Sequence, residues 1–437
     1  MKGNTEHAWI RRKGYLHFDY PISDTPEAFR KVERYITSAQ NVAQHSFYPF
    51  IDYKISSRKV TRNEDGKLVP KSKERPIAFA SHLDSQIYSY YSKILAEHYE
   101  LEIKKRGINE SVLAFRSAHG MSNIGFAKQA FDRIREFGEC GVVAVDISGF
   151  FDNLDHEILK RIWCELISVE RLPKDHFNVY KSITKFSLVS KDEVYEQFGI
   201  SKNNPRDGRK RICTAKEFRD QVRKSGLISA NPKKTKGIPQ GSAISALLSN
   251  VYMLDFDEKI SEIVSEIKGV YFRYCDDMLF IVPPEFTAGI EQQIMDEIAD
   301  LKLEINPDKT EIREFRSTRA GGTVSDKPLQ YLGFTFDGQQ ILIRSAALAR
   351  YSERMRRGVR LAKATKRKHD KAAYRAEDIK PLYKRKLYEK YSHKGRRNFI
   401  RYGLRAANEM NSNSIRRQLK PLWNRLQKEI KGNGVVT

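Results

Sequence analysis

Two apolar segments that end in aspartate are the feature that most limits how this chain can fold. Gly141–Val145 is a run of mostly β-branched residues, which is typical of a buried strand, and it leads directly into Asp146. Val270–Val282 predicts a strand, a tight turn and a second strand, with Asp276 and Asp277 at the tip. If both elements pair in one sheet, the three carboxylates converge. We therefore predict a mixed α+β fold with these aspartates at one edge of a sheet.

Neighbouring carboxylates repel each other, and a divalent cation between them offsets that repulsion. Phosphoryl transfer between nucleotides uses two such cations about 3.5–4 Å apart, and Mg²⁺ prefers hard oxygen ligands. A single aspartate in a turn is more often ordinary turn chemistry. Here the doublet lies between Tyr274 and the apolar run Met278–Val282. This placement favours a metal site over a simple turn.

Positive charge is concentrated in the C-terminal part of the chain. The 437 residues contain 79 Lys plus Arg and 55 Asp plus Glu, a formal net charge of +24. Ser345–Thr437 alone contains 27 basic and 7 acidic residues, or +20, which leaves +4 for the rest. Such a segment predicts a polyanionic partner, of which nucleic acid is the commonest. No sustained apolar face accompanies the charge, so we do not expect membrane binding.

Further elements can be predicted from periodicity and turn residues. A helix is expected from Asp24 to about Ala39, and a hairpin rich in basic residues is expected from Lys54–Val60 and Leu68–Ala80 around a turn at 63–66. Ser182–Thr235 is polar and rich in turn residues, which predicts an irregular insertion. Other helices are expected at Leu83–Tyr99, Asp155–Ser168, Glu291–Leu303 and from Ala346 onward, and a strand is expected at Tyr331–Phe336. Gly237–Phe256 is expected to begin as a Gly/Pro turn and to continue as a helix with small residues.

Cysteine usage and the absence of long apolar stretches indicate a cytoplasmic protein. Cys140, Cys164, Cys213 and Cys275 lack the spacing of zinc ligands, and scattered cysteines fit a reducing compartment. No stretch approaches the ~18–20 apolar residues of a membrane-spanning helix, and the start of the chain lacks the apolar region of a signal peptide.

A series of short motifs resembles one known family. Tyr274-Cys275-Asp276-Asp277 resembles the Y-x-D-D signature of reverse transcriptases, and Asp146–His156 resembles the first metal-binding motif of their bacterial branch, which includes group II intron and retron enzymes. Gly237–Ser242 resembles the P-Q-G motif, and Leu303–Thr310 resembles the lysine-bearing motif that follows it. Tyr331–Phe334 resembles the primer-gripping hairpin. Arg75–Ile77 and Ala114–Ser117 resemble two motifs of the fingers. One short motif is weak, but several in the order of the family are specific. The resemblance covers Lys54–Phe336.

The resemblance implies a right-hand polymerase fold with an antiparallel palm sheet. Residues 1–140 would form an N-terminal segment and the fingers. Residues 141–344 would form the palm, together with part of the fingers and the insertion at about 182–235. Residues 345–437 would form a basic, all-helical thumb.

The resemblance also assigns the metal site. Asp146, Asp276 and Asp277 would bind two Mg²⁺ ions, with Mn²⁺ as an alternative, and Ile147 would belong to the same metal and nucleotide site. Lys309 would donate a proton to the leaving pyrophosphate. The alternative for Lys309 is a solvated lysine after a turn.

For the nucleotide, the resemblance implies that Arg75 clamps the triphosphate together with a nearby lysine, either Lys73 or Lys54. The arginine fork can form two bonds to phosphate oxygens. Phe151 would be a steric gate against the ribose 2′-hydroxyl and so select deoxynucleoside triphosphates, with Phe150 in the core. Gln240 would position the nucleotide and template. The alternatives are an edge-strand charge for the lysine, a core aromatic for Phe151 and a capping amide for Gln240.

Nucleic acid would be bound by residues of the fingers, the primer-gripping hairpin and the thumb. Basic side chains follow phosphates, and exposed aromatics stack on unpaired bases. More than half of the thumb aromatics are expected to form its own core. The implied contacts are Arg116, Gly333, Arg356, Arg357, Arg360, Lys366, Arg367, Lys384, Arg396 and Arg397.

Three functions remain open at this point. The first is an RNA-directed DNA polymerase that takes an RNA template and a DNA primer or product. The second is untemplated, protein-primed or ribonucleotide synthesis on the same site, although Phe151 argues against ribonucleotides. The third is a non-catalytic RNA-binding protein that retains the fold. No zinc endonuclease pattern, RNase H constellation or Val-Thr-Gly thumb signature is evident. The chain therefore most resembles defence-associated reverse transcriptases, several of which use a structured noncoding RNA. The sequence leaves the oligomeric state open.

Overall fold

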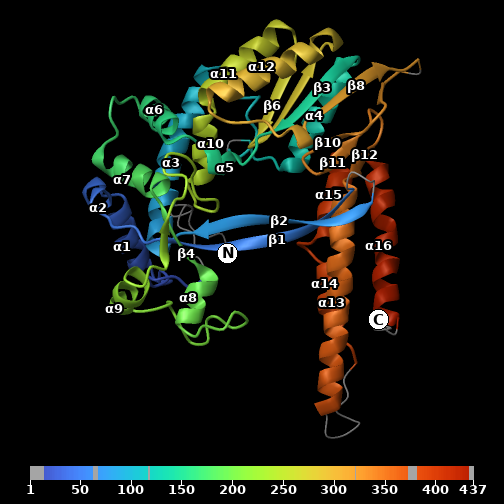
Figure 1. Cartoon of the computed structure of the whole chain (residues 1–437). Coiled ribbons are helices and arrows are strands. Elements are labelled where there is room, and N and C mark those ends of the chain that lie inside the picture. Colours follow the sequence, from blue (N-terminus) through green and yellow to red (C-terminus); the bar gives the residue numbers. More distant parts are fainter. Residues whose placement is uncertain (1–13, 63–66, 117–118, 320, 373–380, 433–437) are drawn as a thin grey trace.

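The computed structural model describes residues 14–62, 67–116, 119–319, 321–372 and 381–432. Figure 1 shows a central sheet with helices packed on it, a helical lobe at the left, a long β-hairpin below and a group of helices at the right. No helix among the described residues is long and apolar enough to cross a bilayer. The α+β class predicted from the sequence is confirmed.

The central sheet is antiparallel and has five strands in the order β6-β7-β3-β8-β9. Its strands are Val270–Tyr274 (β6), Asp277–Val282 (β7), Cys140–Asp146 (β3), Glu311–Ser317 (β8) and Thr323–Ser325 (β9). The middle strand, β3, is buried along its whole length. β-Branched valines suit such a position, because their stiff side chains pack well on a pleated surface. The predicted pairing of the two aspartate-bearing elements in one sheet is confirmed.

Helices cover both faces of this sheet. Alternate residues of a strand point to opposite faces, so Val143 and Val145 pack with the helix α12 (Thr287–Asp300) while Val142 and Ala144 pack with α4 (Asn123–Phe137). Ile290, Ile294 and Ile298 form the buried stripe of α12. Burial of each such side chain contributes about 1.5–3 kcal/mol. The two cores hold the sheet edge with the aspartates in place.

The helical lobe packs against the same core. Its longest helix, α3 (His82–Lys105), presents Tyr88, Tyr91, Leu95 and Tyr99 to the interior. The remaining helices around the central sheet and the helical lobe are α5 (Phe150–Asn153), α6 (His156–Leu166), α7 (Lys174–Thr184), α10 (Ser245–Tyr252) and α11 (Leu254–Glu266). Single turns lie at Pro284–Phe286 (η3) and Pro307–Lys309 (η4). Asp155 caps α6 through the amides of Glu157 and Ile158, as predicted.

The N-terminal helix is shorter than predicted. Helix α1 spans Pro26–Ile36 and is capped by Thr25, not Asp24. The chain then breaks at Ser38, whose hydroxyl accepts from the amide of Asn41 and begins a new helix, α2 (Ala39–Ala43). Ser38 is therefore a second N-cap within the segment that was predicted to be one helix, and the segment forms two short helices instead.

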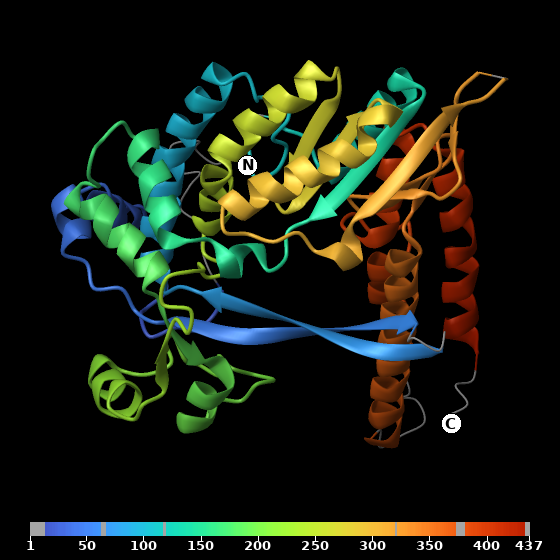
Figure 2. The same ribbon diagram turned by 45° about the horizontal axis from the view of Figure 1, so that its top comes forward.

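A second sheet contains the predicted basic hairpin. Strands β1 (Phe50–Arg62) and β2 (Leu68–Phe79) pair in antiparallel register, and β4 (Ser187–Ser190) joins only the first residues of β1, in parallel. Figure 2 shows the hairpin reaching from the helical lobe towards the C-terminal helices, and Figure 1 agrees. The turn predicted at 63–66 lies outside the described residues.

The insertion at 182–235 is not irregular, which corrects the expectation from the sequence. It contains β4, α8 (Lys191–Gln197), α9 (Ala215–Glu217), a π-helix at Phe218–Arg223 (η2) and β5 (Ile228–Ala230). These short elements enclose a separate small core, in which Phe218 and Val222 pack with Leu16 and Phe18 from the start of the chain. The core is completed by residues about two hundred positions away, so the local sequence conceals it.

The predicted strand at Tyr331–Phe336 is instead a hairpin. Leu329–Tyr331 (β10) and Phe334–Phe336 (β11) pair with each other, and Ile341–Ile343 (β12) completes a three-stranded sheet. The chain reverses at Leu332 and Gly333, whose φ angles are 45° and 93°. Glycine adopts such a backbone without strain. The apolar run therefore conceals a two-residue turn.

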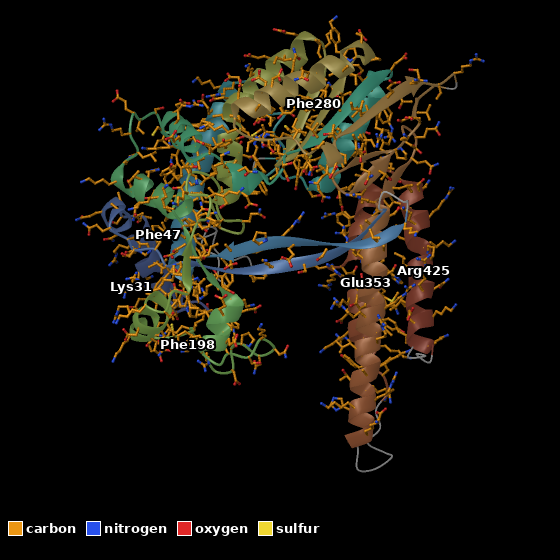
Figure 3. All side chains as sticks on the ribbon, in the orientation of Figure 1. Lys31, Phe47, Phe198, Phe280, Glu353 and Arg425 are labelled. Atoms are coloured by element: carbon orange, nitrogen blue, oxygen red, sulfur yellow. The ribbon has the colours of Figure 1, made fainter. Side chains whose placement is uncertain are left out.

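The C-terminal part is helical, as predicted. It contains α13 (Ser345–Ala372), α14 (Arg385–Tyr391), α15 (Phe399–Glu409) and α16 (Asn413–Lys431). Figure 3 labels Glu353 on α13 and Arg425 on α16, the two long helices that lie side by side. Tyr351, Tyr391 and Leu419 are among the residues that join these helices to the second core.

Candidate active site

Asp146 and Asp277 lie directly opposite each other on neighbouring strands. They are Cα partners in the antiparallel register of β3 and β7, so their side chains leave the same face of the sheet. Asp146 is 8% exposed, whereas Asp276 and Asp277 are partly buried. The structure thus brings Asp146 and Asp277 together at the predicted edge and places Asp276 in the adjoining turn.

The turn that carries Asp276 has a constrained backbone. Cys275 has a φ of 63°, which is rare for a residue with a side chain, and the amide of Ile147 donates to Asp276 O at 3.2 Å. Arg273 Nη1 donates to Cys275 O at 3.2 Å from within the core. These bonds connect the turn to the end of β3, and Ile147 takes part through its backbone.

The Arg273 side chain is held by a buried ion pair. It donates to both carboxylate oxygens of Asp257 on α11, and neither side chain of this pair is exposed. Tyr271 Oη donates to Asp257 Oδ1 at 2.8 Å, and Arg273 Nη1 donates to Asn250 Oδ1 at 3.1 Å. Every charge in this network has a partner, so it stabilises the turn instead of destabilising the core.

The carboxylates create a strongly negative environment at the sheet edge. Burial, together with the charges of Asp276 and Asp146, raises the pKa of Asp277 to about 7, although Lys309 and Arg344 oppose the shift. An added cation would relieve this repulsion. The described residues contain no preformed cluster of three or more metal-binding side chains. Mg²⁺ does not need one, because it is usually bound by one or two carboxylates together with phosphates and water. The donor set therefore fits Mg²⁺.

A cavity of about 640 Å³ opens in front of these residues. Asp146, Asp277 and Lys309 line it from the sheet and from η4. The turn of the β10–β11 hairpin, with Leu332 and Gly333, forms another part of the wall. The site therefore combines anionic metal-type ligands with a hairpin wall and space for a large ligand.

Lys309 contacts the carboxylates directly. Its Nζ forms an ion pair with Asp146 Oδ1, and its side chain is 40% exposed. The turn η4 positions it, because Asn306 caps the turn and the amide of Asn306 donates to Asp146 O at 2.8 Å. The ammonium group of Lys309 thus offsets part of the negative charge of the carboxylates.

The two neighbouring phenylalanines have different environments. Phe150 is 3% exposed and belongs to the main core, whereas Phe151 is only partly buried. Gly149, with a φ of 54°, reverses the chain so that both lie on the short helix α5 after β3. Phe151 also packs against this core, so its role as a steric gate stays a prediction.

The loop with Gln240 packs on the β1–β2 hairpin. The amide of Ala78 in β2 donates to Gln240 O at 2.8 Å. Gly241 has a φ of 113°, and a Cβ there would lie 2.7 Å from Ala78 O. Only glycine permits this approach. The Gln240 side chain is partly buried and bonds to Asp152, the residue after Phe151.

Lys233 is a further residue near this loop that the sequence did not single out. Its Nζ donates to Asn153 Oδ1 at 2.7 Å, and its charge lowers the pKa of Asp152, which burial raises overall. Asn231 holds the segment by donating to Lys236 O at 2.9 Å. Lys233 lies at the end of the insertion, where the sequence shows only a basic run.

Arg75 and Lys73 lie on β2, in register with Ile55 and Ser57 of β1. Arg75 is exposed, and it forms no side-chain hydrogen bond or ion pair with another described residue. Lys54, named as an alternative to Lys73, pairs with Glu74 at 3.1 Å. Arg75 is therefore available for an anionic ligand, while the role of Lys73 stays a prediction.

Arg116 has a different place from the one expected. It is 8% exposed and donates to both carboxylate oxygens of Glu100, to Asn109 and to Val112 O, at 2.6–3.0 Å. These bonds occupy its guanidinium inside the protein. Arg116 thus holds the connection after α3 together and presents no free donor to nucleic acid.

Most of the predicted thumb residues are exposed. Arg357 and Arg360 are exposed on α13, whereas Arg356 pairs with Glu429 at 3.3 Å and Lys366 pairs with Asp370 at 2.5 Å. The others that are exposed are Arg367, Lys384, Arg396 and Arg397. Gly333 lies in the hairpin wall of the cavity, where Arg344 N donates to its carbonyl at 3.1 Å.

Sequence reasoning missed two residues of the cavity, Arg344 and Asn123, and gave no role to a third, Tyr331. Arg344 opposes the raised pKa of Asp277. Asn123 donates to Leu332 O at 3.1 Å and to Tyr402 Oη at 2.9 Å, which joins α4 to the hairpin and to α15. The Tyr331 hydroxyl is buried without a partner in the described residues. Tyr331 was visible within its motif, whereas Arg344 and Asn123 gave no local signal.

An antiparallel sheet with facing aspartates, a hairpin-bearing helical lobe before it and basic helices after it is the right-hand fold of nucleic-acid polymerases. Residues 61–336 match the family model described as reverse transcriptase (RNA-dependent DNA polymerase). This match covers more than half of the chain, which therefore belongs to the reverse transcriptase family.

The solved structures that the chain is similar to include telomerases. Apo telomerase from Candida tropicalis, truncated from its C-terminal domain, is 11% identical with a TM-score of 0.44, and 73% of this chain and 60% of that one are covered. Telomerase from Candida albicans in complex with a fragment of telomeric RNA is 11% identical with a TM-score of 0.41, covering 92% and 66%. The chain thus spans about 60% of the first of these structures. A search of the curated proteins found no match.

Proposed function

We propose that this chain is an RNA-directed DNA polymerase that adds deoxynucleotides to a primer. The observation that carries the proposal is the pair Asp146 and Asp277, which face each other at the edge of a cavity of about 640 Å³. Their shared negative charge suits cations and phosphates together. Membership of the reverse transcriptase family agrees with this chemistry.

The residues of the site would have separate roles in phosphoryl transfer. Asp146, Asp276 and Asp277 would hold two Mg²⁺ ions. When bound, the ions would activate the primer 3′-oxygen and neutralise charge on the triphosphate. Arg75 would bind the triphosphate through its planar fork. Lys309 would leave its contact with Asp146 and protonate the departing pyrophosphate.

Selection of the sugar would depend on Phe151. Its partly buried ring lies on α5, next to Asp152 and the loop with Gln240. A bulky ring there would collide with a ribose 2′-hydroxyl. Lys233, Asn153, Asp152 and Gln240 would hold the ring and the loop in position, because they form one bonded group.

The regions of the chain would have the usual polymerase roles. Residues 1–140 would form the N-terminal segment and fingers, and residues 141–344 the palm. Residues 345–437 would form the thumb, whose exposed arginines and lysines would bind the backbone of an RNA template with its DNA primer or product. The insertion at about 182–235 extends the sheet of the fingers hairpin, which supports its assignment to the fingers.

A primer-extension assay tests this function. Wild-type protein, Mg²⁺, a DNA primer on an RNA template and deoxynucleotides should give extension, and Asp276→Ala with Asp277→Ala should abolish it. The double variant should keep its circular dichroism spectrum and melting temperature, because both carboxylates lie at a turn. A matched control is Asp296→Ala with Asp300→Ala, which removes two exposed carboxylates from α12 and should leave extension unchanged.

Extension that survives in the Asp276/Asp277 variant would overturn the metal assignment. Extension without any template would favour an untemplated activity at the same site. Specific RNA binding without synthesis on any primer, metal or template would favour a non-catalytic RNA-binding protein.

We further propose that the enzyme works with a dedicated structured noncoding RNA in antiphage defence. The support is the resemblance to defence-associated reverse transcriptases. Sequencing of the RNA that copurifies with the protein should give one abundant structured species. A random sample of cellular RNA, together with unchanged phage sensitivity on deletion of the gene, would contradict this assignment.

A further inference from the structure

A second cavity lies among the C-terminal helices, away from the aspartates. It has a volume of about 530 Å³ and is lined by parts of α14, α15 and α16 and the segment between α14 and α15. It shares no lining residue with the cavity of the active site. Its size is within the ~300–1,000 Å³ of ordinary ligand sites.

The wall of this cavity contains an aromatic group. Trp423 is only partly buried, and its ring centroid lies 5.4 Å from that of Tyr388 and 5.1 Å from that of His393. Lys394 Nζ lies 5.4 Å from the Trp423 ring and 5.3 Å from the Tyr388 ring. The apolar side chains of Ile400, Leu404 and Leu419 continue the wall. A flat, apolar ligand can pack here.

The charged residues around the cavity are all basic. Arg401, Arg416 and Lys420 line it and are exposed. Arg401 donates to Gly395 O at 3.1 Å, and Arg416 donates to Asn408 Oδ1 at 2.7 Å. These acceptors are uncharged, so the bonds leave the positive charges uncompensated.

The acidic residues of the same helices pair elsewhere. Glu389 pairs with Arg385, Glu409 with Arg405 and Glu429 with Arg356, at 3.0–3.4 Å. Among the described residues no ion pair engages Arg401, Arg416 or Lys420. Three unpaired cations around one cavity favour an anionic ligand.

We propose that this cavity binds one unpaired nucleotide of a single-stranded nucleic acid. The base packs against Trp423 and the apolar wall, while its phosphates contact Arg416 and Lys420. A nucleotide satisfies both features because it joins a flat base to an anion. An acidic peptide satisfies the charge alone. The expectation that the strand is RNA rests on the proposed function, whereas the nucleotide site itself does not.

Helix α15 connects this cavity with the active site. Tyr402 accepts a hydrogen bond from Asn123, which lines the active-site cavity, while the neighbouring Arg401 lines the second cavity. One helix thus contacts both sites. A nucleotide bound at Trp423 would anchor a template or guide RNA beside the helix that supports the primer-side hairpin.

Binding of a fluorescent, unstructured 12-nucleotide RNA to the full chain tests the proposal. Arg416→Glu with Lys420→Glu should weaken binding roughly tenfold or more, and Trp423→Ala should weaken it by a similar factor, as expected for a lost stacking contact. Matched controls are Arg417→Glu and Lys428→Glu, two exposed residues of α16 that do not line the cavity. The double control changes the charge equally and should weaken binding no more than about threefold, because only distant electrostatics change.

The role of the base is tested separately. An abasic oligomer of the same length should bind wild type and Trp423→Ala equally, and 4-thiouridine in the RNA should cross-link within residues 388–423. Equal loss in the cavity and control variants, an abasic oligomer that binds as well as RNA, or oligoglutamate that competes equally would overturn the site. Extension of a primed template is measured on the same samples. Loss of extension with intact oligomer binding contradicts only the proposed polymerase.

Discussion

Arg273 and Asp257 form a completely buried ion pair next to the turn that carries Asp276. The arginine also donates to Cys275 O, directly before Asp276. Removal of one partner would leave an uncompensated charge in the core. We expect Asp257→Asn to lower the free energy of unfolding by about 3–5 kcal/mol, measured by urea denaturation.

The paired replacement Asp257→Leu with Arg273→Met separates charge from geometry. It should recover much of the lost stability, because it removes both charges. It should not recover primer extension, because the bond to Cys275 O is gone. Full extension in this variant would show that the ion pair does not position the turn.

Phe151 should control the choice of sugar. Phe151→Ala removes the ring that would meet a 2′-hydroxyl, and we expect the ratio of ribonucleotide to deoxynucleotide incorporation to rise at least about tenfold, the scale of one lost steric contact. Single-nucleotide incorporation kinetics measure this ratio. Phe177→Ala, at an exposed phenylalanine on α7, is the control. An unchanged ratio would remove Phe151 from this role.

Gly241 should be intolerant of any side chain. An added Cβ would lie 2.7 Å from Ala78 O, and the φ of 113° disfavours alanine. We expect Gly241→Ala to separate the Gln240 loop from β2 and to raise KM for deoxynucleotides more than it lowers kcat. Gly289→Ala, where a Cβ meets nothing within 4 Å, is the comparison and should retain both constants.

The buried His17 should make the stability of the folded protein fall at acidic pH. Burial, with a smaller contribution from the charge of His82, lowers the pKa of His17 from 6.5 to about 3. The neutral form is favoured in the folded protein, so the stability contribution is complete above pH 6.5. It is lost as the pH falls towards 3, at about 1.4 kcal/mol per pH unit. Urea midpoints of wild type and His17→Gln should converge between pH 7.5 and 5, whereas parallel curves would contradict this.

Binding of RNA should weaken steeply as salt increases, because the C-terminal helices neutralise phosphates. Each phosphate contact contributes about 0.7 to the slope of log K against log salt for single strands. Arg357→Ala with Arg360→Ala should therefore reduce the slope by about 1.4. Salt-insensitive binding would exclude these helices as the main nucleic-acid surface.

The carboxylate edge was predictable because Asp146 and the Asp276-Asp277 doublet follow strand patterns that short-range periodicity reveals. The place of Arg116 was not, since its partners Glu100 and Asn109 meet it only in the folded chain. Likewise, the small core of the insertion is completed by Leu16 and Phe18, which lie near the start of the chain and far away in sequence. Short elements whose partners are distant in sequence leave no local periodic signal.

The β1–β2 hairpin is supported by a neighbouring strand only at its base, where Phe50–Asp52 pair with β4. Beyond that point the two strands bond only to each other, and both outer edges are open along the described residues. A two-stranded ribbon of this kind is marginally stable in water. Its geometry therefore depends on what it contacts. Part of the binding energy of a nucleic acid would be used to order the β1–β2 hairpin, which carries Arg75. A nucleic acid that binds more tightly would therefore also place Arg75 more firmly for the incoming nucleotide.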